Sequence, residues 1–255
     1  MTRRERILRE MGLAPLWRLR DKPAEKLTDE PAVDVSLDSP APPPALPSAL
    51  AEGASLAPDS RMQRIAALGW DELTAAVSGC RDCRLCERRK KTVFGVGDIA
   101  ADWLFIGEGP GAEEDESGEP FVGQAGRLLD AMLAAINLKR GDNVYIGNVV
   151  KCRPPGNRTP EPEETAACFP YLRRQIGLIR PRLIVALGKP AAETLLDAEV
   201  RVGAARGRLF EHGGIPLIVT YHPAYLLRNL TDKTKAWEDL CFARRVMKER
   251  QDAGG

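Results

Sequence analysis

The hydrophobic pattern beyond residue 100 contains four short apolar runs separated by longer, mixed segments. A continuous apolar run of about four to eight residues is typical of a strand that is buried on both faces of a sheet. We therefore predict four buried strands, at 103–106, 144–150, 183–187 and 216–220.

The segments between these runs have the periodicity of helices. Apolar residues recur on one face over 124–138, which predicts a helix there. A second helix is expected to start at Thr159, because this potential capping residue is followed by a proline and an acid, and a third is expected from Lys189. Strands that alternate with helices predict an α/β domain whose parallel sheet is covered on both faces.

The first 60 residues have a different character. Seven of the 20 prolines fall between Pro31 and Pro58, in a stretch without aromatic residues. Such a segment cannot bury enough apolar surface to offset its ordering entropy, so we predict a flexible linker over 21–60. Residues 1–20 form a short amphipathic segment, either a helix docked on the domain or a motif that binds an unknown protein partner. The globular domain is expected over 61–250, behind a disordered N-terminal extension.

Composition limits the function further. The chain has 255 residues, with 37 Lys and Arg against 36 Asp and Glu, which excludes a strongly basic histone-like protein. Any nucleic-acid binding must therefore come from local patches. No run of about 18 apolar residues is present, and the N-terminus lacks the apolar stretch of a secretion signal. We expect a cytoplasmic protein without a membrane partner, in which six cysteines indicate metal or thiol chemistry rather than disulfides.

Chemically unusual residues follow three of the predicted strands. The strand at 103–106 leads into a glycine-rich loop, 107–111, that contains Glu108. Asn148 comes at the end of the next strand, and His222 follows the last one. Ligands of open α/β sheets bind beyond the carboxyl ends of the strands, so we expect these residues to share one site.

Two nearby segments have candidate roles at the same edge. Phe121 is an aromatic residue in a polar loop, where it either stacks on a planar ligand or anchors the core. The segment after His222 contains Leu226, Leu227 and Arg228. Leucines that project from a basic loop suit a wedge pushed into a base stack, and the alternative is a helix start whose leucines pack inward.

The cysteines form a candidate metal site. Cys80, Cys83 and Cys86 have the spacing C-x2-C-x2-C, and Cys152 and Cys168 follow far downstream. Two thiolates at the first spacing can bind one centre, which a distant pair completes. The spacing leaves both zinc and a 4Fe–4S cluster open, and Cys86 is one ligand more than either centre needs.

Taken together, residues 80–229 resemble the family 4 uracil-DNA glycosylases, the iron–sulfur branch of the uracil-DNA glycosylase superfamily. The matching stretches are CRDCRL, VGDIAADWLFIGEGPGAEED, EPFVGQAGRLLD, VYIGNVVKCRPPGNRTP and HPAYLLRN. The resemblance implies a three-layer α/β/α sandwich with a four-stranded parallel sheet, which we expect to be monomeric. It also implies a DNA repair enzyme that flips uracil out of DNA and hydrolyses its N-glycosidic bond, leaving an abasic site.

The resemblance further implies roles for individual residues. A 4Fe–4S cluster would be bound by Cys80, Cys83, Cys152 and Cys168. Phe121 corresponds to the aromatic residue that stacks on the flipped uracil, Asn148 to the amide that separates uracil from cytosine, and His222 to the histidine of the second motif. The first motif contributes Gly107, Glu108 and Gly109 to the uracil pocket, and the wedge corresponds to Leu226, Leu227 and Arg228.

The residue that positions the attacking water is not implied directly. Gly109 stands where the better-known family 1 enzymes carry an aspartate for this purpose, so we take Glu108 and Glu114 as the candidates. The alternative function is a non-catalytic iron–sulfur protein that binds DNA on the same scaffold. The combination of Phe121, Asn148 and His222 favours the enzyme, because a mere DNA binder needs no amide that reads the edge of a base.

Overall fold

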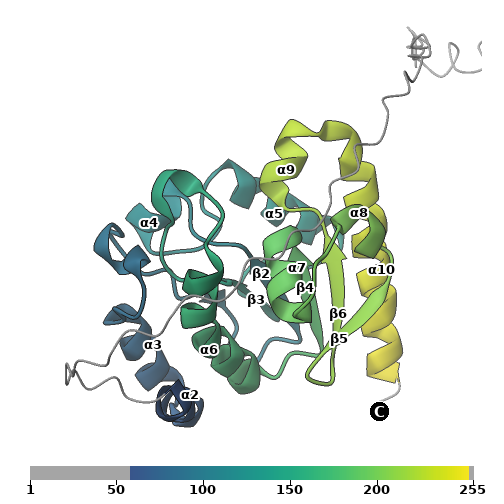
Figure 1. Cartoon of the computed structure of the whole chain (residues 1–255). Coiled ribbons are helices and arrows are strands. Elements are labelled where there is room, and N and C mark those ends of the chain that lie inside the picture. Colours follow the sequence, from purple (N-terminus) through teal and green to yellow (C-terminus); the bar gives the residue numbers. More distant parts are fainter. Residues whose placement is uncertain (1–57, 253–255) are drawn as a thin grey trace, which may run out of the picture. The chain divides into compact units, whose positions relative to one another are not determined.

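A six-stranded sheet, ordered β1-β3-β2-β4-β6-β5, forms the centre of the computed structural model, which describes residues 58–252 (Figure 1). The predicted segment 1–20 and most of the linker lie outside the described residues. The four predicted strands are confirmed as the parallel centre of the sheet, made of β3 (Val144–Asn148), β2 (Trp103–Gly107), β4 (Leu183–Leu187) and β6 (Ile215–Thr220).

The expectation of four strands needs one correction, because an antiparallel strand lies at each edge. These are β1 (Val96–Gly97) beside β3 and β5 (Leu209–His212) beside β6. Neither is fully buried, so neither produces the continuous apolar run by which a central strand is recognised. β5 and β6 form a hairpin whose turn is Gly213 and Gly214, both at positive φ.

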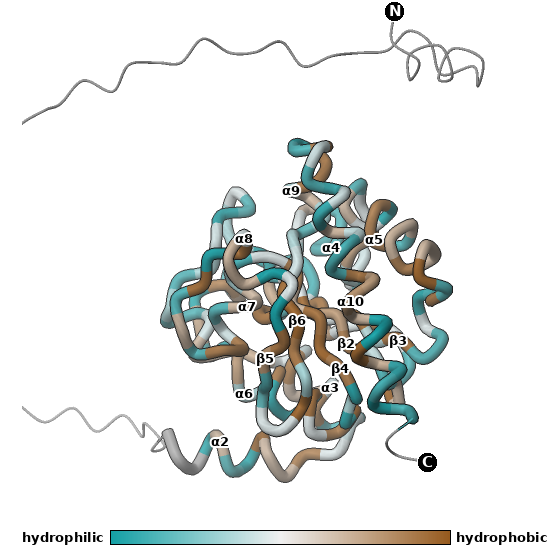
Figure 2. Tube along the Cα trace, turned by 90° about the vertical axis from the view of Figure 1, so that its right-hand side faces the viewer, coloured by the Kyte–Doolittle hydropathy of each residue, from teal (hydrophilic) through white to brown (hydrophobic). Residues whose placement is uncertain are grey.

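Side chains alternate between the two faces of the sheet and build two separate cores. Leu104, Ile184 and Val219 face one core, which contains the buried sides of α3 (Trp70–Ser78), α6 (Pro162–Ile179) and α7 (Lys189–Leu196). Phe105, Val185 and Ile218 face the other, which is shared with α5 (Gln124–Ala135) and α10 (Lys233–Asp252). The predicted three-layer α/β/α sandwich is therefore confirmed, and Figure 2 shows its hydrophobic strands in the interior between more hydrophilic helices.

Helix boundaries follow local capping chemistry more closely than periodicity. α6 begins at Pro162 rather than near Thr159, because the Glu164 carboxylate accepts a hydrogen bond of 2.8 Å from the N–H of Glu161 and so fixes the first turn. α2 (Pro58–Ala67) begins inside the predicted linker and packs on α6. Three short α-helices, α4 (Ala112–Ser117), α8 (Val202–Ala205) and α9 (Pro223–Arg228), and three 3-10 helices, Arg84–Glu87, Pro155–Asn157 and Leu230–Asp232, complete the helical part of residues 58–252. None of the described helices is long and apolar enough to cross a membrane.

The strand register brings the expected functional edge into line. Gly107 pairs with Asn148 across β2 and β3, and Leu187 pairs with Thr220 across β4 and β6. The four parallel strands therefore end at nearly the same level. The segments that follow β2, β3 and β6 leave from this one edge.

Candidate active site

A cleft of about 450 Å³ opens at the carboxyl edge of the sheet. This volume lies within the range of small-molecule sites in proteins. Residues after β2, after β3 and around α9 line it together, as the strand pattern predicted. Its lining includes the expected residues Glu108, Gly109, Glu114, Phe121, Asn148, His222 and Arg228.

Gly107 allows two of these side chains to meet. A Cβ atom at Gly107 would lie 2.6 Å from Asn148 Oδ1 and 2.6 Å from Phe121 Cζ, so no other residue fits there without moving both. The carboxamide of Asn148 and the ring of Phe121 are therefore close neighbours at the end of β2. Asn148 is buried, and its Oδ1 has no hydrogen-bond partner among the described residues. A buried acceptor without a partner is costly unless a ligand satisfies it.

His222 stacks against Phe121 in the lining of the cleft, with ring centroids 5.5 Å apart and planes inclined by 29°. It is the N-cap of α9, where its Nδ1 accepts a hydrogen bond of 3.1 Å from the N–H of Ala224. A neutral imidazole carries its proton on the nitrogen that is not accepting, so this cap places the proton on Nε2. Burial, and to a smaller extent Arg228, lowers the pKa of His222 to about 4, so the ring is neutral at physiological pH.

The two candidate carboxylates have different surroundings. Glu108 is half-buried, and desolvation raises the pKa of its carboxyl group, with a contact to Thr159 that opposes the shift. In contrast, Glu114 accepts three backbone hydrogen bonds: Oε1 from the N–H groups of Val122 (3.0 Å) and Gly123 (3.2 Å), and Oε2 from Gly111 (3.1 Å). Glu114 therefore ties the loop after β2 to the loop that carries Phe121.

The expected wedge is a helix rather than a loop. Leu226 is 1% exposed and belongs to the core shared with α5 and α10, so it cannot project toward DNA. Leu227, 39% exposed, and Arg228, also exposed, lie on the outer side of the same short helix. Leu230, 63% exposed, follows directly in the next turn and was not expected from the sequence. The order of apolar residues in this segment alone could not separate the inward-facing leucine from the outward-facing ones.

Two further cleft residues were not predicted. Arg158 forms a bidentate pair with the buried Glu164, at 2.7 and 2.8 Å, and this pair holds the segment after β3 against the start of α6. Tyr225 stacks on Tyr221 and donates a hydrogen bond of 2.7 Å to Asp232. A basic residue that is followed three to six positions later by an acidic one is common on protein surfaces. The sequence therefore carried no distinctive signal for Arg158.

A second cavity collects the cysteines, as their spacing suggested. Cys80, Cys83, Cys86, Cys152 and Cys168 all line it, and the segment around residue 80 thereby meets the one that follows β3. Cys241 lies apart on α10. Cysteines that are far apart in sequence thus line one cavity. The cavity alone does not show which four of these five cysteines would bind a metal centre.

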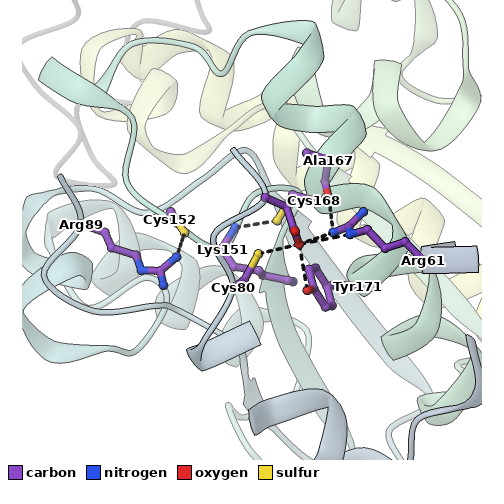
Figure 3. A network of polar contacts seen from close by, with 9 residues as sticks. Arg61, Cys80, Arg89, Lys151, Cys152, Ala167, Cys168 and Tyr171 are labelled. Atoms are coloured by element: carbon purple, nitrogen blue, oxygen red, sulfur yellow. Dashed lines mark hydrogen bonds and ion pairs between the residues drawn. The ribbon is translucent and has the colours of Figure 1, made fainter. Parts of the chain in front are cut away.

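Polar groups surround these thiols (Figure 3). The Arg89 guanidinium donates to Cys152 Sγ at 3.1 Å, and the Lys151 N–H donates to Cys168 Sγ at 3.3 Å. The fully buried Lys151 ammonium donates to the backbone oxygen of Asn148 at 2.8 Å, which links the cavity to the cleft. Asp82 accepts from Arg61, Tyr171 and the Cys80 thiol, at 2.7, 3.2 and 3.1 Å respectively. The donors from Arg89 and Lys151 are suited to stabilising Cys152 and Cys168 as thiolates, whereas Asp82 favours the protonated thiol of Cys80.

The five thiols are the soft ligands that this cavity offers, and thiolates bind either zinc or the irons of an iron–sulfur cluster. Within residues 58–252, no group of three or more His, Cys, Asp or Glu side chains is arranged as a site for a metal ion. The donor chemistry therefore fits a thiolate-bound metal centre, and the positions of the side chains do not separate zinc from a cluster.

Comparison with known proteins gives the family. The model of the uracil DNA glycosylase superfamily matches residues 94–241. The type-4 uracil-DNA glycosylase of Thermotoga maritima is 45% identical over 177 residues, which cover 68% of this chain and 92% of that protein. Those of Pyrobaculum aerophilum and Archaeoglobus fulgidus are 42% and 46% identical, covering 67% and 62% of this chain and 91% and 82% of theirs. The chain therefore belongs to the uracil DNA glycosylase superfamily.

Proposed function

We propose that this chain is a DNA repair glycosylase that takes uracil out of the DNA stack and hydrolyses its N-glycosidic bond, leaving an abasic site. The observation that carries the proposal is the buried Asn148 carboxamide beside the Phe121 ring, because its acceptor oxygen has no hydrogen-bond partner within residues 58–252. A protein that only binds the DNA backbone has no use for such a group. The relatives named above are uracil-DNA glycosylases, which supports the same reaction.

The base is recognised by complementary hydrogen bonds and by stacking. Asn148 Oδ1 accepts from N3–H of uracil, and its amide nitrogen donates to O4. Cytosine has an acceptor at N3 and a donor at C4. The Asn148 oxygen would then face another acceptor and the Asn148 amide nitrogen another donor, so both buried groups would remain unpaired. Phe121 provides the surface on which the extrahelical base stacks.

His222 stabilises the leaving group. As the bond between the sugar C1′ and uracil N1 breaks, its electron pair moves to uracil, and negative charge develops on O2. The Nε2–H of the neutral His222 ring donates to O2 as this charge appears. The low pKa of His222 matters, because a neutral donor lets uracil leave as the anion without a proton transfer.

Glu108 positions the water. A carboxylate at the cleft accepts one proton of a water molecule, the water oxygen forms the new bond to the cationic C1′, and the proton passes to Glu108. Glu114 is less suited to this task, because three backbone N–H groups already occupy its two oxygens. We therefore assign Glu108 to the water and Glu114 to the support of the cleft.

We further propose that Cys80, Cys83, Cys152 and Cys168 hold a 4Fe–4S cluster, with Cys86 as a spare thiol in the same cavity. When bound, the cluster supplies a covalent cross-link between the segment around residue 80 and the segments that follow β3. Leu227 and Arg228 remain the proposed wedge, with Leu226 now assigned to the core.

Strand scission tests the proposed activity. The purified protein is incubated with an oligonucleotide that contains one uracil, and alkali then cleaves any abasic site. We expect scission by the wild type, and a loss of about 100-fold or more for Asn148→Ala and His222→Ala. His212→Ala is the matched control, because this other histidine lies on β5 outside the cleft. No scission by the wild type above background would leave the non-catalytic DNA-binding protein as the remaining candidate.

A further inference from the structure

Phe121 has a backbone conformation that is unusual for its residue type. Its φ angle is 56°, in the left-handed region that bulky residues seldom adopt. The side chain is 6% exposed and its ring lies at the cleft, against Gly107 and His222. Strained residues persist only where the surroundings hold them, and they cluster at functional sites.

Arg140 contacts the backbone at this strained position. Its guanidinium spans two successive carbonyl groups: Nη1 donates to the oxygen of Pro120 and Nη2 to that of Phe121, both at 2.8 Å. The third nitrogen, Nε, donates to Asp130 on α5 at 2.9 Å. One planar group thus fixes the direction of two peptide units relative to a helix.

Gly126 on α5 leaves the space for this arrangement. A Cβ atom there would overlap the Phe121 carbonyl oxygen, so the Phe121 peptide packs directly against the helix. On the other side of Phe121, Glu114 accepts the N–H groups of Val122 and Gly123. The loop is therefore held on both sides of Phe121, and the Arg140 side chain supports it from outside the cleft lining.

We propose that Arg140 is a positioning residue for base binding, which holds Phe121 in its strained conformation so that the ring forms the stacking surface. This inference rests on the proposed function, because it needs a base that stacks on Phe121. Without Arg140, two carbonyl groups lose their shared donor and the Phe121 backbone relaxes toward the extended region. The ring then leaves its place beside Asn148, while contacts to the DNA backbone stay as they are.

Two DNA probes separate this role from general loss of structure. One contains 2′-fluoro-deoxyuridine, whose fluorine destabilises the sugar cation and so slows cleavage, and the other contains a tetrahydrofuran abasic analogue with no base. We expect Arg140→Met to weaken binding of the first about tenfold and to change binding of the second by less than twofold. Arg140→Lys keeps the charge but cannot span both carbonyls, so it should fall between Arg140→Met and wild type.

A double-mutant cycle and a matched control complete the test. In a Phe121→Ala background, Arg140→Met should cause no further loss of binding to the uracil analogue, because it acts through the ring. Arg182→Met, which breaks the ion pair with Asp102 at the opposite end of β4, should leave both probes unaffected. Unchanged binding of the uracil analogue by Arg140→Met, equal losses for both probes, or a full additional loss in the Phe121→Ala background would each overturn the proposal. If wild type itself does not distinguish the two probes, the proposed base pocket fails instead.

Discussion

Replacing each cleft carboxylate by its amide separates a chemical role from a supporting one. In Glu114→Gln, the single amide oxygen can accept either from the N–H of Gly111 or from the N–H groups of Val122 and Gly123. Its NH₂ group then points at the remaining N–H donor and forms no hydrogen bond with it. At least one hydrogen bond to a charged acceptor is lost, which is worth about 1.5–3 kcal/mol. A domain of this size loses about 2–4 °C in Tm per kcal/mol. We therefore expect Tm to fall by about 3–12 °C.

Glu108→Gln should behave in the opposite way. The Glu108 carboxylate is desolvated and accepts no backbone hydrogen bond among residues 58–252, so the neutral amide should cost no stability and Tm should stay within about 1 °C of wild type. Activity should fall by about 100-fold or more, since the water loses its proton acceptor. The wild-type rate should decline as pH falls through the raised pKa of Glu108, because protonation removes the base, and this decline should be absent in the variant.

Calorimetry and single-turnover scission across pH measure both quantities on the same samples. Wild-type activity in Glu108→Gln would show that another group positions the water. An unchanged Tm in Glu114→Gln would show that the three hydrogen bonds of Glu114 do not support the cleft. If this variant also lost its activity, Glu114 rather than Glu108 would be the carboxylate that positions the water.

Three more predictions follow from the described contacts. Burial lowers the pKa of His222 from 6.5 to about 4, so as the pH falls below 6.5 the unfolded state takes up the proton before the folded state does. The free energy of unfolding should therefore decline by up to about 3 kcal/mol between pH 6.5 and 4. Thermal unfolding of His222→Asn should lack this part of the decline. In chemical denaturation, the free energy of unfolding of Leu226→Ala should be about 2–5 kcal/mol lower than that of wild type. Leu227→Ala should keep its stability and lose more activity on double-stranded than on single-stranded substrate. Equal stability losses in the two variants would contradict their different burial. Cys152→Ser should yield less soluble protein and less bound iron, while Cys241→Ser should match wild type, and equal iron content in both would argue against the assigned ligands.

The order of elements in this fold is largely readable from the chain. Strands such as Leu183–Leu187 are buried on both faces, so their apolar runs stand out, and the rule that ligands bind at the carboxyl edge then locates the cleft. The edge strand Leu209–His212 was missed because its side chains are half exposed. Inward-packing leucines in α9 were one of two predicted alternatives, and helical phase over six residues is too short to decide which leucine faces inward.

Other parts of the site depend on contacts that no local pattern records. The role of Glu114 rests on three backbone N–H groups from two different loops, and its place in an acidic run gave no sign of them. Arg140 likewise reaches Phe121 from 19 positions away in sequence. Such contacts exist only after the sheet has brought the loops together, so the sequence could supply candidate residue types but not their partners.

The central claim is that the cleft reads uracil through Asn148 and releases it by hydrolysis. The most direct measurement is mass spectrometry of the products formed in ¹⁸O-labelled water, from matched oligonucleotides that contain either one uracil or one cytosine at the same position. The account predicts free unlabelled uracil, an abasic sugar that carries the heavy oxygen, and no base released from the cytosine strand. Release of cytosine at a similar rate, or heavy oxygen in the free base, would contradict it.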